Sequence, residues 1–206
     1  MMLDVDVRLD QTRMVPVPRT HTDAAARQAW AEDIAGQWGR LHELADERVR
    51  WMTAGLEALA TVAAGESGDL IVIFDPLSQA IAPVRLAIVE GEPTRAEQLS
   101  FLQPVAPLSG RLRLTPPTVF GIGCSSAFPT AQPGVAELRW LFIAGGCTLT
   151  AIASPVGQSA ALSVGVTVED LLTALSVGDR VLSRSPDFDP EALVRVDETA
   201  QPRWSA

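Results

Sequence analysis

The chain has 206 residues, 47% of them hydrophobic, and its 16 basic and 25 acidic residues give a formal net charge of -9. A chain of this length can bury a sizeable core, so we expect one domain. The negative charge repels phosphate backbones and anionic lipid headgroups, which argues against nucleic acid and membrane partners. Every basic residue is Arg, and Lys and Tyr are absent, which excludes Schiff-base lysine, phosphate-loop lysine and tyrosine acid chemistry.

No segment has the pattern of a targeting or membrane-spanning sequence. Residues 1–10 are acidic and alternating, so we expect no secretory signal there. Polar residues and Pro155 interrupt the apolar stretch 147–166, which therefore does not suit hydrocarbon. Cys124 and Cys147 are too few for a disulfide framework and lack zinc-ligand spacing. We predict two buried thiols, no metal and a cytoplasmic location.

The N-terminal residues predict two extended segments. Apolar and charged residues alternate over residues 3–10, a pattern typical of a half-buried strand. Residues 13–18 contain Pro16 and Pro18, which cannot donate ladder hydrogen bonds. We therefore expect this second segment to lie at a sheet edge.

Two helical segments follow. Thr20 and Asp23 have the spacing of a capping box, and the Ala-rich run after them has high helix propensity. Gly36 and Gly39 weaken this helix near its end, and residues 41–64 predict a longer amphipathic helix. The two segments form either a helical hairpin or one kinked helix.

The middle of the chain predicts a β-hairpin and a short helix. Residues 70–74 and 81–89 read as strands joined by a turn at residues 75–78. Thr94 and Glu97 form a second capping-box pattern, which predicts a helix ending near Leu102.

Strands dominate the next part of the sequence. We predict them over residues 111–115, 118–127, 135–143 and 147–154. Their short, Pro-rich or Gly-rich connections require antiparallel neighbours. Residues 160–166 read as another extended piece, and Thr167 with Asp170 predicts the cap of a helix that ends near Leu175.

The order of elements is typical of an α+β fold, with a largely antiparallel sheet and helices packed on one face in two layers. We assign residues 1–178 to a single α+β domain and residues 179–206 to a loosely docked C-terminal tail. A further helical turn is expected to start at Asp189 and Pro190. The isolated apolar residues of the tail are Phe188, Leu193, Val194 and Trp204.

The candidates for catalysis form no recognisable constellation. His21 and His42 are the only imidazoles, and each starts a polar helical segment rather than lying beside a nucleophile motif. Cys124 would need a nearby base to act as a nucleophile. Residues 121–126 resemble a phosphate loop, but no helix follows, so we interpret them as a strand with close backbone packing. We assign no catalytic, cofactor-binding or metal-binding residue.

Acidic and aromatic side chains from separate segments are the remaining candidates. Asp69, Asp75 and Glu137 form no acid and base pair in the sequence, which disfavours a hydrolase without excluding it. A pocket between the helices and the sheet would make the chain a small ligand-binding module or enzyme. The aromatic side chains expected to line such a pocket are Trp30, Trp51, Phe120 and Trp140.

Two short motifs carry a resemblance to known proteins. Residues 15–18 read Val-Pro-Val-Pro before a predicted helix, and residues 150–155 read Thr-Ala-Ile-Ala-Ser-Pro before the last one. With the order of elements, they resemble small uncharacterised actinobacterial α+β proteins, some associated with type VII secretion, whose layout is similar to the Mog1/PsbP fold. That fold generally serves as a binding scaffold, so the resemblance implies an accessory or adaptor role and no functional residue.

These observations predict a non-catalytic protein that binds another protein, either as a secretion accessory or as an immunity-type partner of a toxin. A basic partner is favoured, because opposite charge accelerates encounter and suppresses wrong pairings. A homo-oligomer could form through a sheet edge, whose backbone groups are unpaired. The alternative is the ligand-binding pocket described above, and no cofactor is expected.

Overall fold

The structure is a computed structural model that describes residues 6–65, 68–104, 112–178 and 182–200. Its strands are β1 (Asp6–Val7), β2 (Met14–Pro16), β3 (Asp69–Asp75), β4 (Ala80–Glu90), β5 (Arg113–Leu114), β6 (Cys124–Pro129), β7 (Val135–Ala144), β8 (Cys147–Gly157) and β9 (Leu175–Ser176). Its helices are α1 (Ala24–Leu41), α2 (Asp46–Ala63), α3 (Arg95–Leu102), α4 (Ala161–Thr173) and α5 (Pro190–Ala200).

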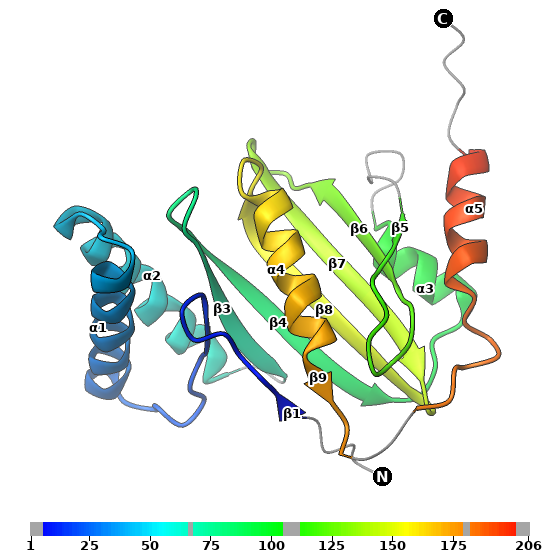
Figure 1. Cartoon of the computed structure of the whole chain (residues 1–206), viewed down its shortest axis with the longest axis horizontal. Helices are drawn as coiled ribbons and strands as arrows, with labels where there is room; N and C mark the ends of the chain where they lie inside the picture. Colours follow the sequence, from blue (N-terminus) through cyan, green and yellow to red (C-terminus); the bar gives the residue numbers. More distant parts are fainter. Residues whose placement is uncertain (1–5, 66–67, 105–111, 179–181, 201–206) are drawn as a thin grey trace, which may run out of the picture.

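A seven-stranded antiparallel sheet in the order β2-β3-β4-β8-β7-β6-β5 forms the centre of the molecule (Figure 1). A second, two-stranded sheet pairs β1 with β9. The predicted α+β class is confirmed, and β2 lies at a sheet edge as its prolines indicated. The predicted hairpin between β3 and β4 is confirmed as well.

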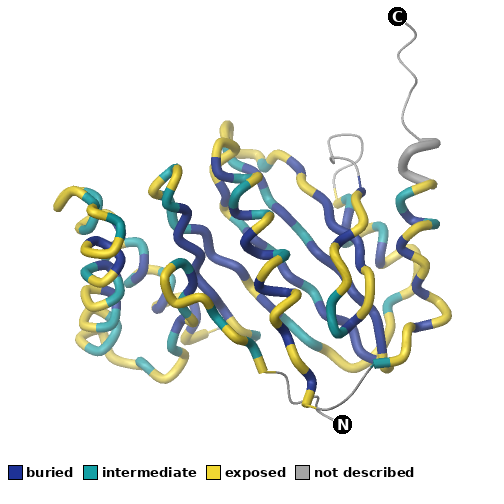
Figure 2. The backbone as a smooth tube through the Cα atoms, in the orientation of Figure 1, coloured by how far each residue is buried: buried dark blue, intermediate teal, exposed yellow. Residues whose placement is uncertain are grey.

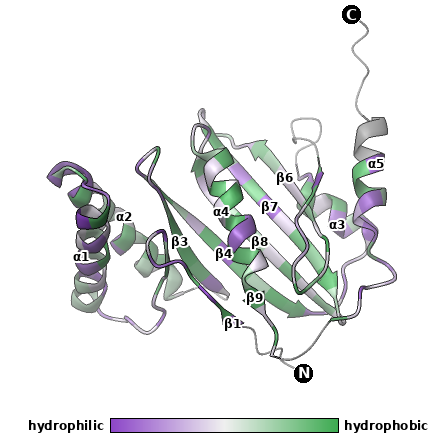
Figure 3. Cartoon of the chain, in the orientation of Figure 1, coloured by the Kyte–Doolittle hydropathy of each residue, from purple (hydrophilic) through white to green (hydrophobic). Residues whose placement is uncertain are grey.

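Strand β3 shows how the helices are distributed over the sheet. Ile71 and Ile73 point toward the apolar cluster that contains α4. Leu70, Val72 and Phe74 alternate with them and pack against α1 and α2. A strand buried on both faces reads as a continuous apolar run, which is why β3 is hydrophobic between its terminal residues Asp69 and Asp75 (Figure 3).

Four helices pack on one face of the sheet, as expected, whereas α4 packs on the opposite face, so helices cover both faces rather than forming the two layers predicted (Figure 1). The α1–α2 hairpin covers β3, while Leu102 of α3 and Leu193 of α5 are buried with Leu141 of β7. On the opposite face, Val164 and Val168 of α4 are buried in the largest cluster. The strands are therefore largely buried, and the outer side of α4 faces solvent (Figure 2).

The capping box of α3 is confirmed. Thr94 Oγ1 accepts from the backbone N–H of Glu97 at 3.4 Å, and the Thr94 N–H donates to Glu97 Oε2 at 2.7 Å. These reciprocal bonds satisfy two of the donors that a helix start leaves unpaired. The hydrogen bonds from Thr94 also hold the pKa of Glu97 below its ordinary value.

The predicted capping box of the first helix is wrong. Asp23 is itself the N-cap, and its Oδ1 accepts from the Ala26 N–H at 2.8 Å. The helix continues past Gly36 and ends at Leu41, and the next helix begins at Asp46 rather than at residue 41, so the two form a hairpin. A Cβ on Gly39 would lie 2.7 Å from Val49 Cγ2, so this glycine permits the close crossing of α1 and α2.

The extended piece predicted at residues 160–166 is wrong, because these residues begin α4. Thr167 lies inside the helix and caps nothing: its hydroxyl donates to the Ser163 carbonyl and accepts from Arg13. Local β-branched residues favour a strand, but the helical spacing of Val164, Val168 and Leu171 buries one face on the sheet. Burial therefore overrides the local preference.

The strand predicted over residues 118–127 is partly wrong. Thr118 and Gly121 exchange backbone hydrogen bonds of 2.9 Å in a tight turn, and the strand begins only at Cys124. Gly121 has φ +83°, a conformation that favours glycine. The turn brings the chain back to pair β5 with β6.

The two chain ends are described in part. Residues 3–5 of the predicted first strand, residues 179–181 and residues 201–206, which include Trp204, lie outside the described residues. The helix expected after Asp189 is present as α5. Phe188 and Leu193 of the predicted tail are buried under the sheet, with Val194 packed beside them.

The described helices include none that is both long enough and apolar enough to cross a membrane.

Candidate functional site

The two histidines lie at the two ends of α1, where His21 precedes the N-cap residue and His42 is the C-cap residue. His42 Nε2 is 3.0 Å from the Thr12 carbonyl oxygen, and its ring packs against Phe74 with centroids 4.8 Å apart. The backbone carbonyl of His21 accepts from Arg27. The His42 imidazole therefore belongs to the packing of α1 against β3, whereas the His21 ring Nδ1 is buried without a hydrogen-bond partner in the described part of the chain.

The two cysteines are free and buried, on strands separated by β7. The Cys124 thiol donates to the Pro190 carbonyl at 3.4 Å. Burial raises the pKa of Cys124 to about 12, and the negative charge of Asp189 adds to the effect. A thiol with this pKa is protonated at neutral pH and does not act as a nucleophile.

The glycine-rich residues 121–126 form no phosphate cradle. A Cβ on Gly123 would lie 2.4 Å from the Leu141 carbonyl oxygen and 2.5 Å from Phe142. The glycine is therefore required by close backbone packing, as interpreted from the sequence. Cys124 of the same segment enters β6 instead of a helix.

The acidic candidates also act locally. Asp75 Oδ2 accepts from the Ser78 N–H at 3.0 Å and from its hydroxyl at 2.5 Å, which closes the β3–β4 turn. Glu137 pairs with Arg139 at 2.6 Å. Asp69 opens β3, so these carboxylates form no acid and base pair. Among the described residues, no three His, Cys, Asp or Glu side chains converge in a way that could hold a metal.

The four aromatic candidates do not converge. Trp30 packs beside the α1–α2 cluster, while Phe120 and Trp140 are buried on the face that α4 covers. Trp51 is exposed on α2, with the Arg48 guanidinium 4.2 Å above its ring. Of these four, only Trp140 lines either of the two grooves described below.

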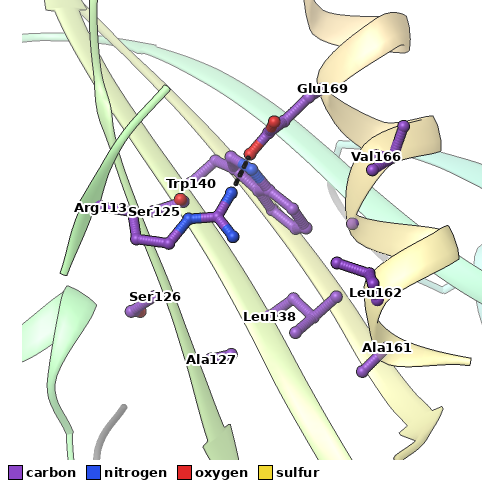
Figure 4. A pocket seen from close by; sticks show the side chains of 11 residues that line it. Arg113, Ser125, Ser126, Ala127, Leu138, Trp140, Ala161, Leu162, Val166 and Glu169 are labelled. Atoms are coloured by element: carbon purple, nitrogen blue, oxygen red, sulfur yellow. Dashed lines mark hydrogen bonds and ion pairs between the residues drawn. The ribbon is translucent and has the colours of Figure 1, made fainter. Parts of the chain in front are cut away.

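A groove of about 370 Å³ lies between α4 and strands β5, β6 and β7, and we call it the α4 groove (Figure 4). Its volume falls within the range of small-molecule and side-chain pockets. The sheet contributes Arg113, Ser125, Ser126, Ala127, Leu138 and Trp140, and α4 contributes Ala161, Leu162, Gly165, Val166 and Glu169.

One end of the α4 groove is polar. Arg113 of β5 and Glu169 of α4 form an ion pair of 3.2 Å across it. Ser125 lies opposite Trp140 in the β6–β7 register. Trp140 is 2% exposed, and its Nε1–H is buried without a hydrogen-bond partner in the described part of the chain. A buried donor without an acceptor is costly, so this end of the groove calls for an acceptor.

The other end and the rim of the groove are apolar. Ala127 and Leu138 line the floor, and Leu162 and Val166 stand on the α4 side (Figure 4). Leu162 is 75% exposed and Val166 52% exposed. They lie one helical turn apart, so they form one apolar row beside the opening. Together with the apolar floor of the groove, they extend one continuous apolar surface, the kind of feature that can mark a binding site.

Gly165 widens the groove. A Cβ at this position would meet only Leu138 Cδ1, at 3.8 Å, which is an ordinary contact. Glycine in a helix costs about 1 kcal/mol relative to alanine. Packing therefore does not require this glycine, and its effect is to leave space above Leu138.

A second groove of about 440 Å³ lies on the opposite face, beside α3. Glu90, Glu92, Glu97 and Phe101 are among its lining residues. Glu92 Oε2 accepts from the Ser185 hydroxyl at 2.5 Å, and Glu97 closes the α3 capping box. At least two of these carboxylates thus already serve the fold, and the α4 groove is the better candidate.

Sequence reasoning missed most of the α4 groove because it read residues 160–166 as extended. The one signal present was the pair Leu162 and Val166 at helical spacing, outside the buried positions of the same helix. The sequence predicts Trp140 as a pocket residue, but Arg113 and Glu169, which line the same end of the groove, are 56 residues apart in the sequence.

Comparisons of the chain with protein-family models, with curated proteins and with solved structures gave no match.

Proposed function

We propose that the chain is a non-catalytic binding protein that contacts a partner protein through the α4 groove. The observation that carries the proposal is the exposed apolar row of Leu162 and Val166 beside an apolar groove. Apolar side chains next to a concave surface are what protein partners bury as anchors. A secretion accessory and an immunity-type partner of a toxin would both use such a surface, and they differ in the partner captured.

The proposed partner is basic overall, because the chain carries a net charge of -9. Opposite charges act over distances of about 10 Å at ordinary ionic strength, so they accelerate encounter before the apolar surfaces meet. We also propose a cytoplasmic location, which the free, unbridged cysteines support.

The test is affinity capture from the native host with the tagged chain and two variants. Leu162→Asp places a charge on the apolar row, and Val62→Asp places the same charge on α2, where Val62 is 47% exposed. We expect one stoichiometric protein that is retained by the wild-type chain and by Val62→Asp and lost with Leu162→Asp. More of it should be retained at low than at moderate salt.

Capture that is equal for the wild-type chain and both variants would contradict the proposal, because the contact would then lie elsewhere. Recovery of the chain alone would also contradict it. The volume of the α4 groove then favours the second candidate, a small-ligand-binding module. In that case a metabolite should raise the Tm of the wild-type chain, since a ligand that binds only the folded state stabilises it.

A further inference from the structure

We infer that the α4 groove binds a neutral peptide segment of the partner, with one apolar side chain inserted above Leu138 and one backbone carbonyl accepting from Trp140 Nε1–H. The inference rests on the proposed function and specifies its ligand. It follows from the donor, the charges and the shape of the groove.

The donor is the indole of Trp140. Its ring is 2% exposed, and no described residue accepts a hydrogen bond from Nε1. In Figure 4 the ring lies across the groove with its nitrogen on the side of Arg113 and Glu169. An indole can only donate, so the ligand atom that satisfies it must be an acceptor.

The charges at the polar end select a neutral acceptor. Arg113 and Glu169 pair at 3.2 Å, so together they leave no net charge for a ligand to match. A charged ligand group at this end would be attracted by one member of the pair and repelled by the other, so it would gain no net attraction to offset its desolvation. A peptide carbonyl carries the acceptor without the charge.

The acceptor reaches Nε1 when the Arg113 side chain moves aside. That side chain is 63% exposed, whereas Glu169 is 16% exposed. Because the guanidinium is open to solvent, it can turn outward at small cost while it still lies within about 10 Å of Glu169, so this end of the groove stays neutral overall. The Trp140 ring and the backbone of β7 can stay in place.

The apolar part of the surface favours a peptide over a small molecule. Gly165 leaves room above Leu138 for one side chain. Leu162 and Val166 extend the apolar surface beyond the cavity, and a ligand confined to the cavity would leave both exposed. A peptide segment that passes over the rim would cover them.

The experiment follows the indole N–H signal of Trp140 by ¹H–¹⁵N NMR while capped tripeptides are added. The signal is identified among the five tryptophans by its loss in Trp140→Phe. We expect acetyl-Gly-Leu-Gly-amide and acetyl-Gly-Phe-Gly-amide to move the signal downfield. The Glu and Arg peptides of the same length should leave it unchanged.

Two variants separate the contribution of the Trp140 hydrogen bond to peptide binding from the contribution of the groove's shape. Trp140→Phe keeps an aromatic ring and removes the donor, so the leucine peptide should bind about fivefold more weakly, measured from the backbone signals of Ser125 and Gly165. Gly165→Leu fills the groove and should abolish binding while its spectrum remains that of a folded chain. Equal affinity in Trp140→Phe would overturn the proposed hydrogen bond.

Three further outcomes would distinguish failure of the peptide inference from failure of the proposed function. If hexanamide, a neutral amide with a short alkyl chain, binds as tightly as the leucine peptide, the groove is a small-molecule site and the peptide inference is wrong. If no peptide moves the Trp140 signal, the inference is wrong even where capture depends on Leu162. If the peptides bind but no partner is captured, the groove chemistry stands and the proposed function fails.

Discussion

Two buried tryptophans differ in whether a hydrogen-bond acceptor is available to the indole N–H. Trp38 in α1 and Trp140 in β7 are each 2% exposed. Trp38 Nε1–H donates to the Gln11 carbonyl at 3.2 Å, and its ring stacks on Phe74 at 5.4 Å. Trp140 Nε1–H has no partner among the residues described. The Trp38 indole thus has both its packing and its hydrogen bond within the core. The Trp140 indole N–H is buried without an acceptor.

Gly39, next to Trp38 in the sequence, and Gly165, which lines the same groove as Trp140, show the same difference between tight and loose packing. A Cβ on Gly39 would clash with Val49, so the crossing of α1 and α2 requires glycine. A Cβ on Gly165 would make an ordinary contact with Leu138, so the packing of α4 does not require it. The α1–α2 side is thus packed for stability, whereas the α4 side gives up stability at a groove. Such a local departure is typical of a functional site.

The largest expected effect is at the α1–α2 crossing. Gly39→Ala should lower the free energy of unfolding by about 2 kcal/mol, because the added methyl group must push Val49 away. In a chain of this size that corresponds to a fall in Tm of roughly 4 to 8 °C, measurable by calorimetry. An unchanged Tm would mean that the two helices separate freely and that their close packing is not a stabilising feature.

An intermediate effect is expected at Asp75, where the α4 side meets the β3–β4 turn. Burial tends to raise the pKa of Asp75, but hydrogen bonds outweigh it and hold the pKa below the ordinary value of 3.8. Because the Ser163 hydroxyl donates to the Ala160 carbonyl, we attribute the lowering chiefly to Ser78. The carboxylate, rather than the carboxylic acid, is therefore the form that stabilises the turn.

A lowered folded-state pKa contributes stability above the unfolded-state pKa, and this contribution is lost as the pH falls through the folded-state value. Asp75→Asn should therefore lower the free energy of unfolding by about 1 to 2 kcal/mol at pH 7. The difference from the wild-type chain should shrink below pH 4 and vanish in stronger acid, as measured by urea unfolding. A difference that stays constant with pH would contradict the role of the charge.

The smallest expected effect has the opposite sign. Gly165→Ala should raise the free energy of unfolding by about 0.5 to 1 kcal/mol, because alanine is the better helix former and its methyl group has room. Paired with Gly39→Ala, it tests the comparison directly by thermal unfolding. A loss of stability would show that the groove is tightly packed, and the contrast between the two sides would fail.

Local signals carried much of the fold. The Thr94 and Glu97 pair predicted the start of α3, and the prolines of residues 16–18 predicted that β2 lies at a sheet edge. The short connections predicted antiparallel strands. These features depend on residues within a few positions of one another, so the sequence contains them directly. The local signal at residues 160–166 was misleading, because β-branched valine favours a strand unless tertiary burial selects the helix.

By itself, the sequence determined the α+β class, the antiparallel sheet and the buried thiols. Only the tertiary structure decided that α4 covers the face opposite the other four helices, that β1 pairs with β9, and that Arg113, Trp140 and Glu169 meet at one groove. The physical reason is that hydrogen bonds and caps link neighbours in sequence. A groove, in contrast, is the space left between segments whose relative positions are set by how apolar faces from the whole chain are buried together.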